Sequence, residues 1–238
     1  MGIEMLNTAA GSVDSSALSW LVLAFGLGLL HAFDADHVMA LSVFATGKQR
    51  AREGVRAGLR WSLGHGLVLG LVGGILFGLG RALPPHWSAM AERAVGGTMV
   101  LLGAYVLVDL IRRRRHLHFH EHEGLPPHAH WHSHDEASAH HHDHGALMVG
   151  ALHGLAGSAP ILAVLPAAAR SPGLGLAYLL IFSVGVALAM AAVSGLLGHF
   201  AGRLSDSAHA GSTRGITALR MLSATGSIAL GAWIALSS

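Results

Sequence analysis

Imidazole and carboxylate side chains are concentrated in one short stretch of an otherwise apolar segment. The stretch "LLHAFDADHVMAL" covers residues 29–41 and contains His31, Asp34, Asp36 and His37. An ionisable residue at the centre of a membrane span costs on the order of 2.5–3.5 kcal/mol, so it is a functional residue by default. A divalent cation neutralises carboxylates and binds imidazole lone pairs. The stretch therefore predicts a metal site inside the membrane.

Helical geometry separates one of these four side chains from the others. At about 100° per residue, Asp34 lies about 60° from His31, and His37 lies about 60° beyond Asp34. Asp36 lies about 140° from His31 on the same ideal helix. It must therefore contact a second helix, orient a ligand from a second layer, or join the site through local unwinding. Broken helices are common at the mid-membrane sites of transporters.

A further histidine, His65, occurs in the apolar stretch "WSLGHGLVLG". We expect it close in depth to His37, as another metal ligand or as a hydrogen-bonded packing residue. The chain contains no cysteine, which excludes disulfides and thiolate metal sites. Imidazole and carboxylate donors without sulfur suit Ni²⁺, Co²⁺, Zn²⁺ or Cu²⁺, and the donors alone do not choose among them.

The composition is that of an integral membrane protein. The 238 residues are 52% hydrophobic and 12% charged, whereas soluble domains have about 25% charged residues. The sequence pI is near 9.7, but the formal net charge is only +2. Arginine clusters at helix ends explain this balance better than a nucleic-acid partner does.

Six apolar segments are each long enough to cross about 30 Å of hydrocarbon. They cover residues 17–45, 61–83, 94–111, 146–169, 174–200 and 215–236. Twelve Lys and Arg lie on one side of these spans and three on the other, so the richer side is expected to be cytoplasmic. With six spans, both termini are then extracytoplasmic. The predicted fold is an all-α integral membrane protein.

The two halves of the chain resemble each other. "VGALHGLAGSAP" (149–160) aligns with "LGLLHAFDADHV" (27–38), which places His153 on His31 and Ser158 on Asp36. Two later pairs of segments align in the same order. Three spans per repeat force opposite orientations, so we expect two inverted three-helix repeats with the site near mid-membrane. His153 and Ser158 are the candidate contributions of the second half to one asymmetric site.

The predicted organisation has four parts. An extracytoplasmic segment covers 1–16, a first repeat 17–111, a cytoplasmic His-rich loop 112–145, and a second repeat 146–238. The loop contains twelve of the nineteen histidines, mixed with Glu, Asp and Pro. Such a composition cannot build a packed core, so we expect disorder without metal. The loop would buffer imported ions or feed an exit path, or it is a solubilising linker.

The motifs resemble those of the nickel/cobalt transporter (NiCoT) family. "HAFDADH" is similar to the family's H-x4-D-H signature, and "SLGH" is similar to its second motif. "LHGLAGSAP" looks more like the related six-span nickel permeases and urease-accessory permeases, and the larger family members usually have eight spans. The resemblance implies metal binding by His31, Asp36 and His37, by His65 of the second motif, and by Asp34 of the extended motif.

The resemblance implies a secondary permease for Ni²⁺ or Co²⁺ in the bacterial inner membrane, acting in uptake, with no organic cofactor and no enzymatic activity. The alternatives are an efflux permease of the same superfamily, a zinc transporter and an intramembrane metalloenzyme. The H-x-x-x-D pairs of cation-diffusion facilitators and the H-E-x-x-H of metalloproteases are absent from the spans. A further alternative is an accessory protein that hands nickel to a metallochaperone or enzyme-maturation partner.

Overall fold

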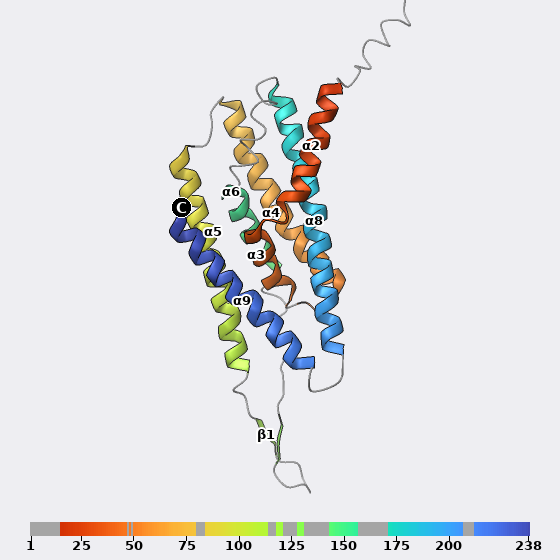
Figure 1. The fold of residues 1–238 in the computed structure, drawn as a ribbon, viewed down its shortest axis with the longest axis vertical. Coiled ribbons are helices and arrows are strands. Elements are labelled where there is room, and N and C mark those ends of the chain that lie inside the picture. Colours follow the sequence, from red (N-terminus) through yellow and green to blue (C-terminus); the bar gives the residue numbers. More distant parts are fainter. Residues whose placement is uncertain are drawn as a thin grey trace, which may run out of the picture.

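The structure is a computed structural model that describes residues 15–46, 48, 50–79, 84–113, 118–120, 128–130, 143–156, 171–206 and 212–238. Within these ranges the chain forms a bundle of helices (Figure 1). The helices are α2 (Ser15–His31), α3 (Ala35–Ala45), α4 (Ala51–Gly78), α5 (Pro85–Arg113), α6 (Asp143–Ala156), α8 (Pro172–Asp206) and α9 (Ser212–Ser237).

Four helices are long and apolar enough to cross a membrane by themselves. They are Ala51–Phe77, Pro85–Arg112, Gly173–Leu204 and Gly215–Ser237. A bent pair, Leu18–His31 with Ala35–Ala45, passes the same test as one broken span. The predicted fourth span is represented only by the short apolar helix Gly145–Ala156, because residues 157–170 lie outside the described ranges. The structure thus has four to five candidate spans rather than the six predicted.

Several helices extend beyond the apolar segments that predicted them. The second span was predicted over 61–83, but α4 begins at Ala51 and includes Arg52, Arg56 and Arg60. Arginine is a good helix former, so the helix continues past the point where hydrophobicity falls. Likewise α5 begins at Pro85 rather than at 94, and proline suits the first position of a helix because its missing N–H needs no partner there.

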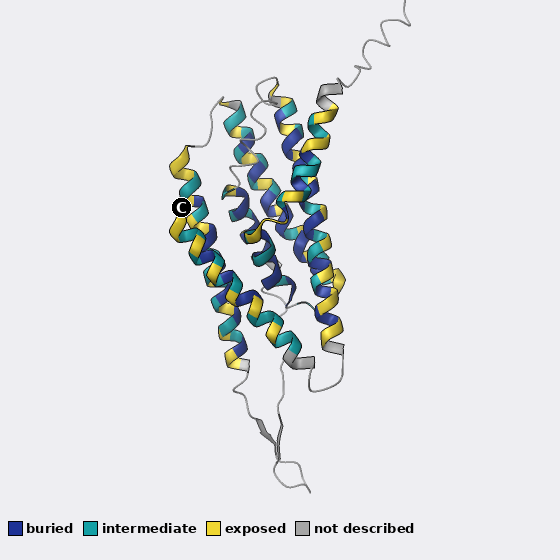
Figure 2. Ribbon diagram, in the orientation of Figure 1, coloured by how far each residue is buried: buried dark blue, intermediate teal, exposed yellow. Residues whose placement is uncertain are grey.

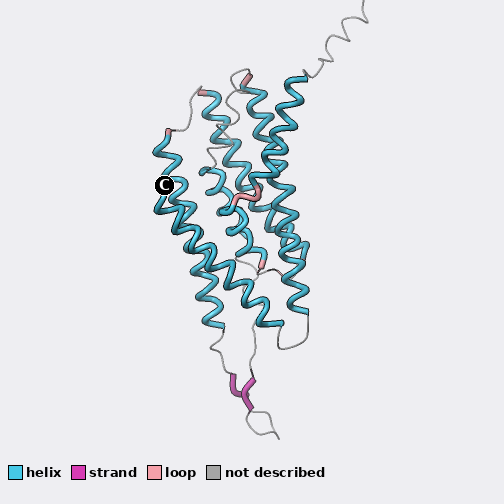
Figure 3. The backbone as a smooth tube through the Cα atoms, viewed as in Figure 1, coloured by secondary structure: helices cyan, strands magenta, loops and turns pink. Residues whose placement is uncertain are grey.

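The first predicted span is broken in the middle of the bundle (Figure 3). Helices α2 and α3 meet at a bend of 59°. At the break, the Phe33 N–H donates to the Leu30 carbonyl (2.9 Å) and the Asp34 N–H to the His31 carbonyl (3.0 Å). The Val38 N–H then donates to the Asp34 carbonyl at 3.0 Å, which starts the new helix. The chain is therefore unwound at residues 32–34, and Asp36 lies in the first turn of α3.

Helix α4 packs against both α8 and α6, α5 packs against α9, and α2 packs against α8. The buried faces turn inward and the exposed residues lie on the outside of the bundle (Figure 2). Many of those exposed residues are large and apolar, including Leu67, Leu71, Leu101 and Leu180. An apolar exterior of this extent suits contact with lipid rather than with water. The chain is therefore described as a multi-pass membrane protein.

The two halves make equivalent close contacts between helices. A Cβ atom at Gly28 would collide with the carbonyl oxygen of Phe182, and one at Gly150 would collide with the carbonyl oxygen of Trp61. The sequence repeat aligns Gly150 with Gly28 at an offset of 122, and Phe182 with Trp61 at an offset of 121. Only glycine allows the backbones to approach this closely, so α2 meets α8 as α6 meets α4.

A similar pair of contacts joins α5 to α9. A Cβ at Gly103 would lie 2.5 Å from the carbonyl oxygen of Ala224, and a Cβ at Gly231 would lie 2.5 Å from that of Gly96. The offset of 128 that aligns the third and sixth spans converts one contact into the other. Two equivalent close contacts at glycine therefore join α5 to α9.

The described part of the His-rich loop is a short antiparallel pair of strands, β1 (His118–His120) and β2 (His128–His130). His118 is opposite His130 and His120 is opposite His128. Disorder was expected throughout this loop, and it is not what the structure has at these six residues. The rest of the predicted loop between Arg113 and Asp143 lies outside the described residues.

Candidate metal site

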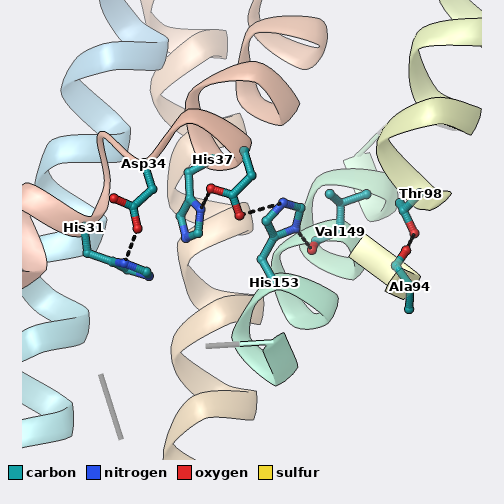
Figure 4. Close-up of polar contacts among 8 residues, drawn as sticks. His31, Asp34, His37, Ala94, Thr98, Val149 and His153 are labelled. Atoms are coloured by element: carbon teal, nitrogen blue, oxygen red, sulfur yellow. Dashed lines mark hydrogen bonds and ion pairs between the residues drawn. The ribbon is translucent and has the colours of Figure 1, made fainter. Parts of the chain in front are cut away.

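His31 is the last residue of α2, and its ring is held by a carboxylate across the helix break. Its Nδ1 lies 2.7 Å from Oδ2 of Asp34 (Figure 4). Asp34 occupies the N-cap position of α3 but makes no side-chain capping hydrogen bond. Because Nδ1–H donates to this carboxylate, the lone pair of the ring remains on Nε2. That Nε2 is buried and has no hydrogen-bond partner among the described residues.

His37, in the first turn of α3, repeats this arrangement with its neighbour in sequence. Its Nδ1 lies 2.9 Å from Oδ1 of Asp36. The side chain is buried, and its Nε2 also has no partner within the described ranges. The ring centroids of His37 and His31 are 4.5 Å apart. The break in the helix therefore brings both unpaired nitrogens to one place.

His65 reaches the same place from α4. It is fully buried, and neither Nδ1 nor Nε2 has a partner in the described part of the chain. Its ring centroid lies 5.6 Å from that of His31 and 5.4 Å from that of His37. A buried polar atom without a partner costs about 1–3 kcal/mol. A packing histidine would avoid this cost through a hydrogen bond, and His65 makes none among the described residues.

His153 reaches this group from α6, in the second half of the chain. Its Nδ1–H donates to the Val149 carbonyl oxygen at 2.8 Å, which leaves the lone pair on Nε2 (Figure 4). That Nε2 lies 4.0 Å from Oδ2 of Asp36. The centroids of the His153 and His37 rings are 5.3 Å apart. Helix α6 thus presents an oriented imidazole to the carboxylate of α3.

Two sets of side chains have ligand atoms close enough to hold an ion. One set is His31, His37 and His65; the other is Asp36, His37 and His153. Within each set the ligand atoms all lie within 4.8 Å of one another. Histidine ligands of metals usually donate their other ring N–H to a carboxylate or a backbone carbonyl. His31, His37 and His153 all have this second contact.

The structure brings most of the sequence-predicted residues together. The four histidines and Asp36 form the two sets, and His31 is in contact with Asp34. The side chain of Asp34 is more than half exposed, so its part here is to orient His31. Ser158 lies outside the described residues.

Sequence reasoning missed an aromatic residue that lines the group. Trp61 stacks on His65 with ring centroids 5.2 Å apart and an interplanar angle of 15°. It also contacts His37 and His153, at centroid distances of 4.8 Å and 5.3 Å. The available signal was spacing, because Trp61 precedes His65 by four residues and so shares its helix face. An aromatic residue of α8, Phe182, also lies beside the group, with its ring centroid 5.3 Å from that of His31.

The family model of NicO, described as high-affinity nickel-transport protein, matches residues 17–237. The chain belongs to this family. It is also 29% identical over 183 residues to the urease accessory protein UreH of Bacillus sp. (strain TB-90), which covers 76% of this chain and 77% of that protein. No solved structure matches the chain.

Membership of the NicO family confirms the resemblance drawn from "HAFDADH" and "SLGH". It supports nickel transport as the function and Ni²⁺ as the substrate of this NicO chain. The expectation that the chain is not an enzyme is consistent with a family of transporters.

Proposed function

We propose that this chain is a secondary uptake permease for Ni²⁺, with Co²⁺ as a second substrate, and that His31, Asp36, His37, His65 and His153 bind the ion inside the membrane. The observation that carries the proposal is the convergence of buried imidazole nitrogens without partners around His37. Transition metals of this class bind well to imidazole. Asp36 supplies the negative charge that offsets part of the charge of the cation.

The proposed transport cycle is alternating access by two inverted three-helix repeats. Its support is the set of equivalent glycine contacts, in which α2 meets α8 as α6 meets α4. Each repeat would contribute to the site at their interface, as in other transporters built from inverted repeats. The driving force would be the membrane potential or a proton gradient, because the chain has no phosphate-binding loop of the nucleotide-hydrolysing type.

The proposed orientation places the end of the bundle that carries β1 in the cytoplasm of the cell, with the membrane being the bacterial inner membrane. Helix α4 begins, α5 ends and α8 ends toward this end (Figure 1). The basic residues Arg52, Arg56, Arg112 and Arg203 lie in those helix ends. An excess of Lys and Arg favours the cytoplasmic side. Both termini would then be extracytoplasmic.

The His-rich loop is proposed to receive nickel on that cytoplasmic side and pass it to a metallochaperone or enzyme-maturation partner. Many weak imidazole sites on one tether raise the local metal concentration without a rigid site. The similarity to UreH, which is named as a urease accessory protein, favours a partner of this kind.

The decisive experiment is accumulation of radioactive nickel in cells that express the wild type, His37→Ala or His199→Ala at equal membrane levels. His37 belongs to both candidate sets, whereas His199 is an exposed residue near the end of α8 and serves as the matched control. We expect accumulation with the wild type and the control and none with His37→Ala.

Efflux is the competing direction, and the same cells distinguish it. Cells that hold less nickel with the wild type than with an empty vector would identify an exporter. Unlabelled cobalt added in excess should compete with nickel if both ions share the site. Equal nickel in all cells would contradict the proposal.

A further inference from the structure

We infer that the ion occupies two adjoining positions in turn, one formed by His31, His37 and His65 and the other by Asp36, His37 and His153, and that His37 holds it during the exchange. This inference rests on the proposed function and adds to it the path that the ion follows between two sets of ligands. It starts from the two sets of ligand atoms, which have only His37 in common.

The first position is built from imidazole alone. His31 and His37 each present a buried Nε2 without a partner, and His65 presents a ring with both nitrogens unpaired among the described residues. The carboxylates near this set contact the far nitrogens of the rings, since Asp34 holds Nδ1 of His31 and Asp36 holds Nδ1 of His37. An ion here would be bound by neutral nitrogen donors and would keep its full charge.

The second position contains a carboxylate oxygen. Oδ1 of Asp36 is used by His37, but Oδ2 lies 4.0 Å from Nε2 of His153. Metal–ligand bonds to imidazole nitrogen and carboxylate oxygen are about 2.0–2.2 Å long. One ion therefore fits between these two atoms with both bonds made. The carboxylate would bind the cation more strongly by charge than the three imidazoles do.

The shared histidine limits the pair to one ion at a time. An ion that moves between the positions stays beside the His37 ring while it exchanges His31 and His65 for Asp36 and His153, and it replaces the hydrogen bond between Asp36 and Nδ1 of His37 when it binds that carboxylate. It therefore never has to regain a full shell of water inside the membrane, which would be costly. The non-shared ligands also come from different directions, because α2 and α6 enter the bundle from opposite ends (Figure 1).

The test uses the full-length chain in which the twelve histidines between residues 116 and 144 are replaced by asparagine. Nickel bound by the loop then does not add to the number of ions measured at the buried site. In this background His65→Gln, His153→Gln and His37→Ala are compared, with His199→Gln as the control. Bound nickel is measured by equilibrium dialysis in detergent, and imidazole ligands are counted by X-ray absorption at the nickel edge. Nickel uptake is measured in proteoliposomes.

We expect His65→Gln and His153→Gln each to bind one nickel ion while uptake falls by at least about tenfold, the lower end of the usual effect of perturbing a metal site. The bound ion in His153→Gln should retain its imidazole ligands from the first position. In His65→Gln it should show fewer imidazoles and a carboxylate. His37→Ala should lose binding and uptake together.

Two outcomes would overturn the inference. Loss of binding in either Gln variant as complete as in His37→Ala would indicate one site with four histidines. Wild-type uptake by either variant would show that its position is not on the route. Size-exclusion chromatography and thermal unfolding check the folding of each variant, and His65→Asn and His153→Asn replace a Gln variant that fails. Absence of uptake by the unsubstituted chain would instead refute the proposed function.

Discussion

The two halves of this chain share a packing scheme but differ in their chemistry. The ring centroid of His31, in the first half, lies 5.3 Å from that of Phe182 in the second, and the ring centroid of His153, in the second half, lies 5.3 Å from that of Trp61 in the first. Both pairs are related by the internal repeat. The glycines that allow close helix contact, Gly28 and Gly150, are retained at equivalent places as well. The two halves therefore share the same helix packing, including these individual side-chain and glycine contacts.

The contacts of the two imidazoles differ at Nδ1. His31 donates to the carboxylate of Asp34, whereas His153 donates to the backbone carbonyl of Val149. Both contacts fix the ring and leave Nε2 without a hydrogen-bond partner in the described part of the chain, but only the carboxylate adds charge. The comparison teaches that helix packing constrains both halves, while the negative charge next to these rings comes from the first half.

The largest effect is expected from Asp36→Asn, which removes the carboxylate between the halves. Its oxygens contact His37 and approach His153, so the change removes the negative charge and leaves one acceptor oxygen for two imidazole rings. We expect nickel uptake to fall on the order of 100-fold, the upper end of the effect seen when a contact of a metal ligand is lost. Uptake of radioactive nickel at matched protein levels measures this.

Asp36→Glu is the companion variant, since it retains the charge but displaces the oxygens. Partial recovery of uptake in Asp36→Glu would show that charge is the main contribution of this residue. Wild-type uptake by Asp36→Asn would contradict the assignment of charge to the first half.

A smaller effect is expected from Asp34→Asn. The carboxylate orients His31 but is more than half exposed, and an amide oxygen can still accept the hydrogen bond from Nδ1–H. We therefore expect the half-saturating nickel concentration to rise about tenfold, with the maximal rate retained. The dependence of initial uptake on nickel concentration separates these two quantities. Equal losses in Asp34→Asn and Asp36→Asn would remove the distinction between the two carboxylates.

Gly28→Ala and Gly150→Ala test whether the packing of the halves is equivalent. Each added methyl group meets a backbone carbonyl oxygen of the neighbouring helix, so each should reduce the free energy of unfolding by about 1–3 kcal/mol. Gly70→Ala is the control, because a Cβ there has nothing within 4 Å. Thermal unfolding in detergent compares the three. A loss at Gly28 without a loss at Gly150 would show that only one half depends on close contact.

Much of this arrangement could be predicted from the sequence, because its signals are local. Hydrophobic length predicted the long helices, and the cost of burying ionisable residues singled out His31, Asp36 and His37. The offsets between the halves also relate the glycines that the structure shows in equivalent contacts. The sequence could not say which arrangement Asp36 adopts, since an unwound turn depends on the contacts that replace its hydrogen bonds.

The ends of the helices and the role of Trp61 were not predicted, for different reasons. Helix α4 starts at Ala51 because helical backbone continues through arginines that a hydrophobic window excludes. Trp61 resembles any other apolar residue of a membrane span until the neighbouring helices are placed. Its contacts with His37 and His153 join residues far apart in the chain, and such contacts leave no local pattern.

The smallest effect is expected at Trp61, whose indole N–H has no hydrogen-bond partner within the described ranges. Trp61→Phe retains an aromatic face against His65, so we expect nickel uptake to change by less than about threefold, within the range of a single aromatic contact. Trp61→Leu removes the stacking. It should raise the half-saturating nickel concentration by up to about tenfold, which corresponds to about 1.4 kcal/mol. Phe182→Leu, at the equivalent place beside His31, is the matched control from the other half. If Trp61→Phe abolished uptake, the indole N–H would have to act on the ion path, and the two aromatic residues would no longer be equivalent supports.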